Sequence, residues 1–234
     1  MSQNPLVPTS GALVKQLEKS GSLSSLSDLV RVRDNENVAL LVDVSGSMVD
    51  SVDDGASYDR NYTRRIDALR IVVRDVIRTK LVPVFAFGGP LNDSDHRMQY
   101  CWQVPFDAIP EPVGGTPLRQ AIEMMRSQGF GRLLVISDGK PDDASGALEA
   151  ARQFGGRIDV VFVGPANDWM GGSAFLEELA KATGGNRFEG DLGDTKQITG
   201  TIAGLLAGEV MEEVDEDDDE DDDEDDDEDE DDDE

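Results

Sequence analysis

The sequence predicts an α/β fold in which helices flank a doubly wound, mostly parallel sheet. From residue 37 onward, compact apolar runs alternate with segments of helical periodicity. Such runs are typical of parallel strands that are covered on both faces, because neither face needs polar side chains. The length of 234 residues suffices for one such domain with short extensions. We therefore expect an N-terminal extension at 1–36, one folded domain at 37–208 and an acidic tail at 209–234.

The predicted elements follow one another in regular order. Buried strands are expected at 38–42, 81–87, 133–136 and 158–163, with an edge strand at 98–104. Helices are expected at 66–77, 118–126, 147–154, 174–182 and 198–206. The strand at 81–87 should end at Gly88-Gly89-Pro90, where the glycine-rich sequence interrupts the apolar run.

A doubly wound sheet binds its ligands at the carboxyl ends of its strands, near the point where the strand order reverses. That rule points to the residues after Val42 and Ile136, which end two of the predicted strands. We expect the functional site there.

Most of the unusual charge lies in the tail. The net charge is −29, and 22 of the 50 acidic residues are Glu212, Glu213 and the unbroken run at 215–234. The remaining 28 acidic and 21 basic residues give the rest of the chain an ordinary balance. It has no basic stripe that would follow a phosphate backbone, which argues against direct nucleic-acid binding.

Consecutive carboxylates repel one another and bury nothing apolar, so the sequence predicts a disordered tail. Three roles for the tail remain open. It could raise solubility, bind a basic protein surface or imitate nucleic acid, or supply carboxylates to a metal site of its own chain.

The numbers of cysteine and histidine residues limit the cellular compartments and the kinds of metal or catalytic site that we expect. Cys101 is the only cysteine, which excludes an intramolecular disulfide and fits a reducing compartment. The single His96 argues against a histidine-rich zinc site or a histidine-based catalytic triad. The sequence shows neither a signal-peptide pattern nor the roughly 18 to 20 apolar residues that a membrane-spanning helix needs. We expect a cytoplasmic protein without membrane contact.

Oxygen-bearing side chains gather directly after the first predicted strand. Asp43, Ser45 and Ser47 are spaced two residues apart in a loop that Gly46 allows to fold tightly. A carboxylate and two hydroxyls suit a hard cation such as Mg²⁺, which takes oxygen ligands in octahedral geometry. The alternative is a strand-to-helix turn whose side chains only cap backbone amides.

This loop resembles the Asp-x-Ser-x-Ser signature of the metal-ion-dependent adhesion site in von Willebrand factor A domains. Two later segments are similar to the second and third loops of that site, namely Gly114-Gly115-Thr116-Pro117-Leu118 and Ser137-Asp138-Gly139. The resemblance covers residues 37–208 and implies a Rossmann-like sheet.

The resemblance also implies a complete site for one divalent cation, Mg²⁺ or alternatively Mn²⁺ or Ca²⁺. Its residues would be Asp43, Ser45, Ser47, Thr116 and Asp138. The three hydroxyls would bind the metal directly, and the two carboxylates largely through water or outer contacts.

Three hydroxyls and two carboxylates under-neutralise a divalent cation, so a carboxylate from another protein could complete its shell. The resemblance accordingly implies a non-enzymatic protein-binding module whose partner offers an Asp or Glu, working beside an AAA+ ATPase or in another intracellular assembly. One alternative is a structural component in which the metal only stabilises the fold. Another is a Mg²⁺-dependent hydrolase resembling haloacid dehalogenase-like phosphatases, but that motif needs a second aspartate where this chain has Ser45.

Overall fold

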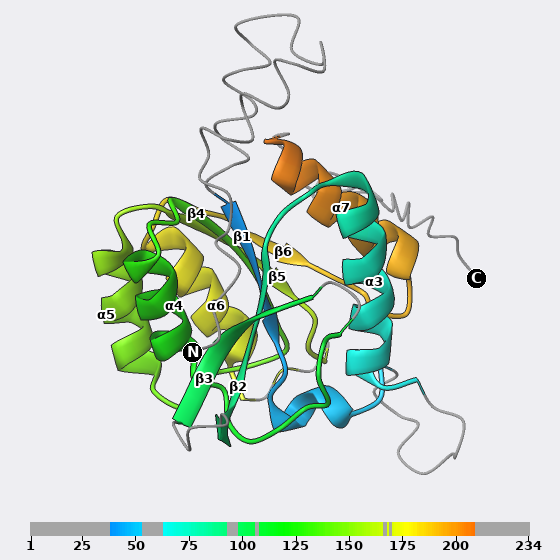
Figure 1. The fold of residues 1–234 in the computed structure, drawn as a ribbon, viewed down its shortest axis with the longest axis horizontal. Helices are drawn as coiled ribbons and strands as arrows, with labels where there is room; N and C mark the ends of the chain where they lie inside the picture. The colour runs from blue at the N-terminus through cyan, green and yellow to red at the C-terminus, as the bar shows by residue number, and fades with distance from the viewer. Residues whose placement is uncertain are drawn as a thin grey trace, which may run out of the picture.

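The computed structural model describes residues 38–52, 63–92, 98–105, 108–165, 168 and 170–208. The N-terminal extension expected at 1–36 and the acidic tail expected at 209–234 lie outside the described residues. Within the described part, a six-stranded sheet has the order β3-β2-β1-β4-β5-β6 and carries helices on both faces (Figure 1). All neighbouring strands are parallel except β2 and β3. The predicted doubly wound, mostly parallel α/β fold is confirmed.

The strands are β1 (Val38–Asp43), β2 (Val84–Asn92), β3 (Met98–Val104), β4 (Arg132–Ser137), β5 (Arg157–Phe162) and β6 (Arg187–Glu189). A 3-10 helix, η1 (Gly46–Val49), follows β1. The α-helices are α3 (Arg65–Thr79), α4 (Leu118–Ser127), α5 (Ala144–Phe154), α6 (Gly172–Lys181) and α7 (Thr195–Ala207).

Two apolar cores lie on opposite faces of the sheet. Leu40 and Val42 of β1 belong to the core shared with α3 and α7, whereas Ala39 and Leu41 belong to the core shared with α4, α5 and α6. Figure 1 shows these two groups of helices on either side of the strands. Strand β1 is therefore buried on both faces, which explains its unbroken apolar run.

The structure corrects the predicted end of the second strand. Instead of stopping before Gly88, β2 continues to Asn92 and pairs with β3 again after a register shift between Phe87 and Leu91. A Cβ on Gly88 would lie 2.8 Å from the carbonyl oxygen of Val44. The glycine therefore permits an irregularity and a close backbone approach within a strand, rather than ending it. The short β6 and η1 were not predicted.

The reversal of strand order lies between β1 and β4, which are parallel neighbours. The helix that follows β1 packs on one face of the sheet, and the helix that follows β4 packs on the other. The loops after these two strands consequently share one edge, as predicted for the site. No helix in the described segments combines the length and apolarity needed to cross a membrane.

Candidate metal centre

Asp43 ends β1 in a fully buried position, and its two carboxylate oxygens are held from different parts of the chain. Oδ1 accepts a 2.7 Å hydrogen bond from the backbone N–H of Ser45. Oδ2 accepts a 2.6 Å hydrogen bond from the hydroxyl of Ser137, the last residue of β4. This carboxylate therefore joins the ends of the two strands that form the switch point.

Ser45, Ser47 and Asp138 form a continuous chain of side-chain contacts. The Oγ atoms of Ser45 and Ser47 lie 3.2 Å apart, and Ser47 Oγ donates a 2.8 Å hydrogen bond to Asp138 Oδ1. Ser45 and Asp138 are buried, whereas Ser47 is exposed. The cluster thus begins in the interior at Asp43 and reaches the surface at Ser47.

The loop that carries Thr116 lies beside these residues. The backbone N–H of Gly46 donates a 2.9 Å hydrogen bond to Gly114 O, and that of Asp142 donates a 3.2 Å bond to Thr116 O. Thr116 is nearly buried, and its hydroxyl forms no hydrogen bond with any residue that the structure describes. The fold brings Asp43, Ser45, Ser47 and Asp138 into one cluster and places the Thr116 backbone next to it, but no hydrogen bond joins the Thr116 side chain to these four residues.

Gly114 allows the loop that carries Thr116 to approach the backbone of Gly89 closely. Its φ of +66° lies in the left-handed region, and a Cβ there would stand 2.0 Å from the carbonyl oxygen of Gly89. Both the backbone conformation and the missing side chain are therefore required at this position.

Arg65, the first residue of α3, contributes a positive charge that the sequence analysis missed. Its Nη1 lies 3.1 Å from Asp138 Oδ2, 3.5 Å from Ser47 O and 3.7 Å from Asp50 Oδ2. Its side chain is only 8% exposed. A local signal was present, since Arg65 falls at helical spacing in line with the buried stripe of Leu69, Val72, Val73 and Val76. A charged residue on an apolar stripe indicates a buried partner.

The electrostatics of the cluster favour an added cation. Burial, and then the proximity of Asp138, raises the pKa of Asp43 to about 7. Burial also raises the pKa of Asp138, although the Ser47 hydroxyl and Arg65 oppose the rise. Hydrogen bonds from Ser137 and Ser45 oppose the rise at Asp43. A cation near both carboxylates would offset the cost of burying their charge.

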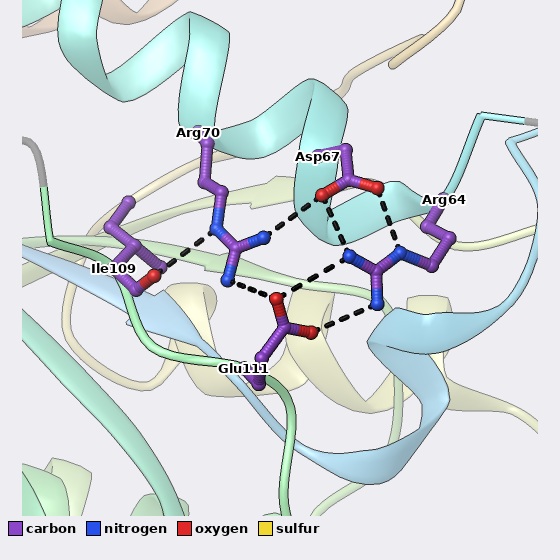
Figure 2. A network of polar contacts seen from close by, with 5 residues as sticks. All are labelled: Arg64, Asp67, Arg70, Ile109 and Glu111. Atoms are coloured by element: carbon purple, nitrogen blue, oxygen red, sulfur yellow. Dashed lines mark hydrogen bonds and ion pairs between the residues drawn. The ribbon is translucent and has the colours of Figure 1, made fainter.

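A polar network on the exposed side of α3 fixes the segment that leads to Thr116 (Figure 2). Arg64 and Arg70 both bind the carboxylate of Asp67 and that of Glu111, which lies in the segment between β3 and α4. Arg70 also donates a 3.1 Å hydrogen bond to Ile109 O. The network thereby ties the approach to the second loop to the helix that follows the first loop.

The residues present fit a hard divalent cation. No three His, Cys, Asp or Glu side chains cluster as a metal site anywhere in the described ranges. A cation here would consequently depend on hydroxyl oxygens as well as on Asp43 and Asp138. An all-oxygen donor set selects Mg²⁺, Mn²⁺ or Ca²⁺ over metals that prefer sulfur or nitrogen. The hydroxyl of the buried Thr116, which forms no hydrogen bond within the described part of the chain, agrees with such a role.

Comparisons with solved structures support the fold. The PilB minor pilin from Streptococcus sanguinis aligns at 14% identity with a TM-score of 0.52, over 75% of this chain and 62% of the pilin chain. A single-residue mutant of that pilin aligns at 14% identity with a TM-score of 0.50, over 73% of this chain and 62% of the mutant chain. This chain therefore spans less than two thirds of the length of these pilins.

A manganese-loaded TRAP protein from Plasmodium vivax aligns at 16% identity, with a TM-score of 0.45, over 72% of this chain and 74% of that one. No protein-family model matches the chain, and no curated protein matches it either. The two pilin alignments agree with the predicted α/β fold, and at 14% identity they bear on the fold alone.

Proposed function

We propose that Asp43, Ser45, Ser47, Thr116 and Asp138 hold one divalent cation, Mg²⁺ or alternatively Mn²⁺ or Ca²⁺. In this proposal the protein is a non-enzymatic module that binds an Asp or Glu side chain of a protein partner through that cation. The observation that carries it is the contact chain from Ser45 through Ser47 to Asp138, next to the buried Asp43. Ser47 and Asp138, 91 positions apart in the sequence, meet there through side-chain oxygen atoms.

The positions of these residues suggest a different role for each in the proposed metal site. Asp43 is locked by Ser45 N–H and Ser137 Oγ, so its carboxylate stays at the floor of the site. Ser47 lies at the exposed rim, where a ligand from outside can arrive. The cation, when bound, would supply the positive charge that attracts the partner carboxylate. Because the site provides only two carboxylates, an incoming third one would find the cation under-neutralised.

Two exposed apolar side chains near the site support a protein as the partner. Val49, in the same 3-10 helix as Ser47, is 41% exposed. Met170 is 58% exposed and precedes Gly172, whose Cα is so close to Gly139 that an added Cβ would lie 2.7 Å away. Apolar contacts around a central charged contact are typical of protein interfaces. Three further points stay predictions from the sequence. They are cooperation with an AAA+ ATPase or another intracellular assembly, binding of a basic protein surface by the acidic tail, and a cytoplasmic location.

The proposal is tested by capturing partners from a lysate with the 234-residue chain, in Mg²⁺ and in chelator. Capture should require Mg²⁺ and should be lost in Asp43→Ala. Asp75→Ala should behave as wild type, because that carboxylate is exposed and, among the described residues, its ion pairs are with arginines of α3. Equal capture by wild type in chelator, or by Asp43→Ala, would contradict it.

The same experiment distinguishes the proposed function from the alternative in which the protein is a structural component and the metal only stabilises its fold. If the metal only stabilises the fold, chelation should lower the melting temperature and leave the captured complex intact. Saturating Mg²⁺ should stabilise the wild type by about 2.7 kcal/mol when its free concentration is a hundredfold above Kd. Asp43→Ala should lose that increment.

A further inference from the structure

The candidate metal centre already contains a cation of its own. The Arg65 guanidinium contacts Oδ2 of Asp138 at 3.1 Å, while Oδ1 of the same carboxylate accepts the Ser47 hydroxyl. Both oxygens of Asp138 are therefore engaged in the structure. The guanidinium is also close to Ser47 O, so it contacts two of the five residues assigned to the metal.

A buried positive charge at this position opposes a divalent cation. The two charges would share the Asp138 carboxylate, and repulsion between them is strong at short range where little water screens it. Arg65 also donates a charged hydrogen bond to Asp138, which withdraws negative charge from the carboxylate and leaves less of it for a metal.

Asp50 offers the guanidinium an alternative partner. Its Oδ2 lies 3.7 Å from the same Nη1, and its side chain is 63% exposed. The backbone holds the pair together, since Arg65 N–H donates a 2.9 Å hydrogen bond to Asp50 O. Arg65 could consequently release Asp138 without losing all ionic contact.

We propose that Arg65 competes with the divalent cation for Asp138 and thereby sets a low affinity for the metal, with Asp50 receiving the guanidinium when the metal binds. This inference rests on the proposed function and adds its regulation. Because Arg65 begins α3 and Asp50 directly follows η1, metal occupancy is coupled to the junction between these two helices.

The inference is tested by whether removal of the Arg65 charge raises or lowers the affinity for Mg²⁺. Mg²⁺ binding is measured by calorimetry on the 234-residue wild type and on its Arg65→Gln, Arg65→Lys and Arg78→Gln variants, with folding checked by circular dichroism. Changing an outer contact of a metal ligand typically alters affinity by about 10- to 100-fold. Competition predicts that Arg65→Gln binds Mg²⁺ at least about tenfold more tightly, with a lower melting temperature in chelator. Arg65→Lys should stay near wild type because it keeps the charge.

Arg78→Gln is the control for the loss of one positive charge. It lies in the last turn of the same helix, is exposed, and should leave Mg²⁺ binding unchanged. Asp50→Asn provides a second test that leaves every assigned ligand in place. It should weaken Mg²⁺ binding in the wild-type background and have a smaller effect in the Arg65→Gln background, because the two residues act as a pair.

The inference is supported by one outcome only, which is tighter Mg²⁺ binding by Arg65→Gln than by wild type. Weaker binding would overturn it and show that Arg65 orients Asp138 for the metal, and unchanged binding would overturn it by showing that the two are not coupled. If neither wild type nor Arg65→Gln binds Mg²⁺, the proposed function is wrong and this inference falls with it. If wild type binds Mg²⁺ and Asp43→Ala does not, but Arg65→Gln gains nothing, only the role of Arg65 is wrong.

Discussion

The hydroxyl of Ser137 donates a 2.6 Å hydrogen bond to Asp43 Oδ2 across 94 positions of sequence. Both residues are fully buried, so the lost donor in Ser137→Ala cannot be replaced readily by water. We expect this variant to lose about 1–3 kcal/mol of unfolding free energy, the usual cost of a buried acceptor left without its donor. Its Mg²⁺ affinity should fall by about tenfold, because the bond positions one of the proposed metal ligands.

Urea unfolding in chelator and calorimetry with Mg²⁺ check these two effects. Ser127→Ala is the matched control, since Ser127 is exposed and its hydroxyl donates to Met124 O of its own helix. A Ser137→Ala variant as stable as this control would show that the bond contributes nothing.

Gly114→Ala should destabilise the protein more than Gly129→Ala, although both glycines have positive φ, +66° and +82°. At Gly129 an added Cβ meets nothing within 4 Å, so only the backbone strain of about 1–2 kcal/mol applies. At Gly114 the Cβ would also meet Gly89 O, which adds about 1–3 kcal/mol for overpacking.

The difference is measured by denaturant unfolding of both variants. Gly114→Ala should also weaken Mg²⁺ binding, because the clash displaces the loop of Thr116. Equal losses of stability in the two variants would contradict the close packing of Gly114 on Gly89.

The network of Arg64, Asp67, Arg70 and Glu111 should give a pH-dependent contribution to stability (Figure 2). Hydrogen bonds from Arg64 and then Arg70 lower the pKa of Glu111, and Arg64 is the main cause of the lowered pKa of Asp67. A carboxyl whose pKa is lower in the folded state stabilises the protein above its ordinary pKa. That contribution is lost as the pH falls through the folded-state pKa.

Glu111→Gln should therefore be less stable than wild type at neutral pH, by about 1 kcal/mol or less because the groups are well exposed. The difference should shrink in acid and also at high salt. Thermal unfolding from pH 7 to pH 3 measures it, and a difference that does not change with pH would exclude the ionic network as its cause.

Asp159→Ala should separate stability from metal binding. The carboxylate is fully buried in β5 and binds Arg132 and Arg157, which begin β4 and β5 at the edge opposite the candidate metal centre. Removing it takes the acceptor away from two partly exposed guanidinium groups and from the Asn186 N–H, at a cost of about 1–3 kcal/mol. Calorimetry on the folded variant should give the wild-type Mg²⁺ affinity, and a large change would mean that the two edges are coupled.

The predicted elements agree with the structure where the signal is local. An apolar run such as that of β1, or the stripe along α3, indicates a buried strand or helix because side-chain spacing alone determines which faces can be buried. The prediction fails for β6, which has only three residues, and for the end of β2. Pairing with β3 keeps β2 in the sheet beyond Gly88, and no local pattern contains that pairing.

The amino-acid sequence by itself determined the fold class and the loops that meet at the candidate metal centre, since the motifs around Asp43, Thr116 and Asp138 are local. Only the tertiary structure decided that Ser137 donates a hydrogen bond to Asp43 and that Arg65 binds the Asp138 carboxylate. The reason is that each contact joins segments more than 70 positions apart, and the pairing of β1 with β4 and the packing of α3 on the sheet bring them together. Local spacing shows that a charge is buried, whereas the fold determines which charge lies opposite it.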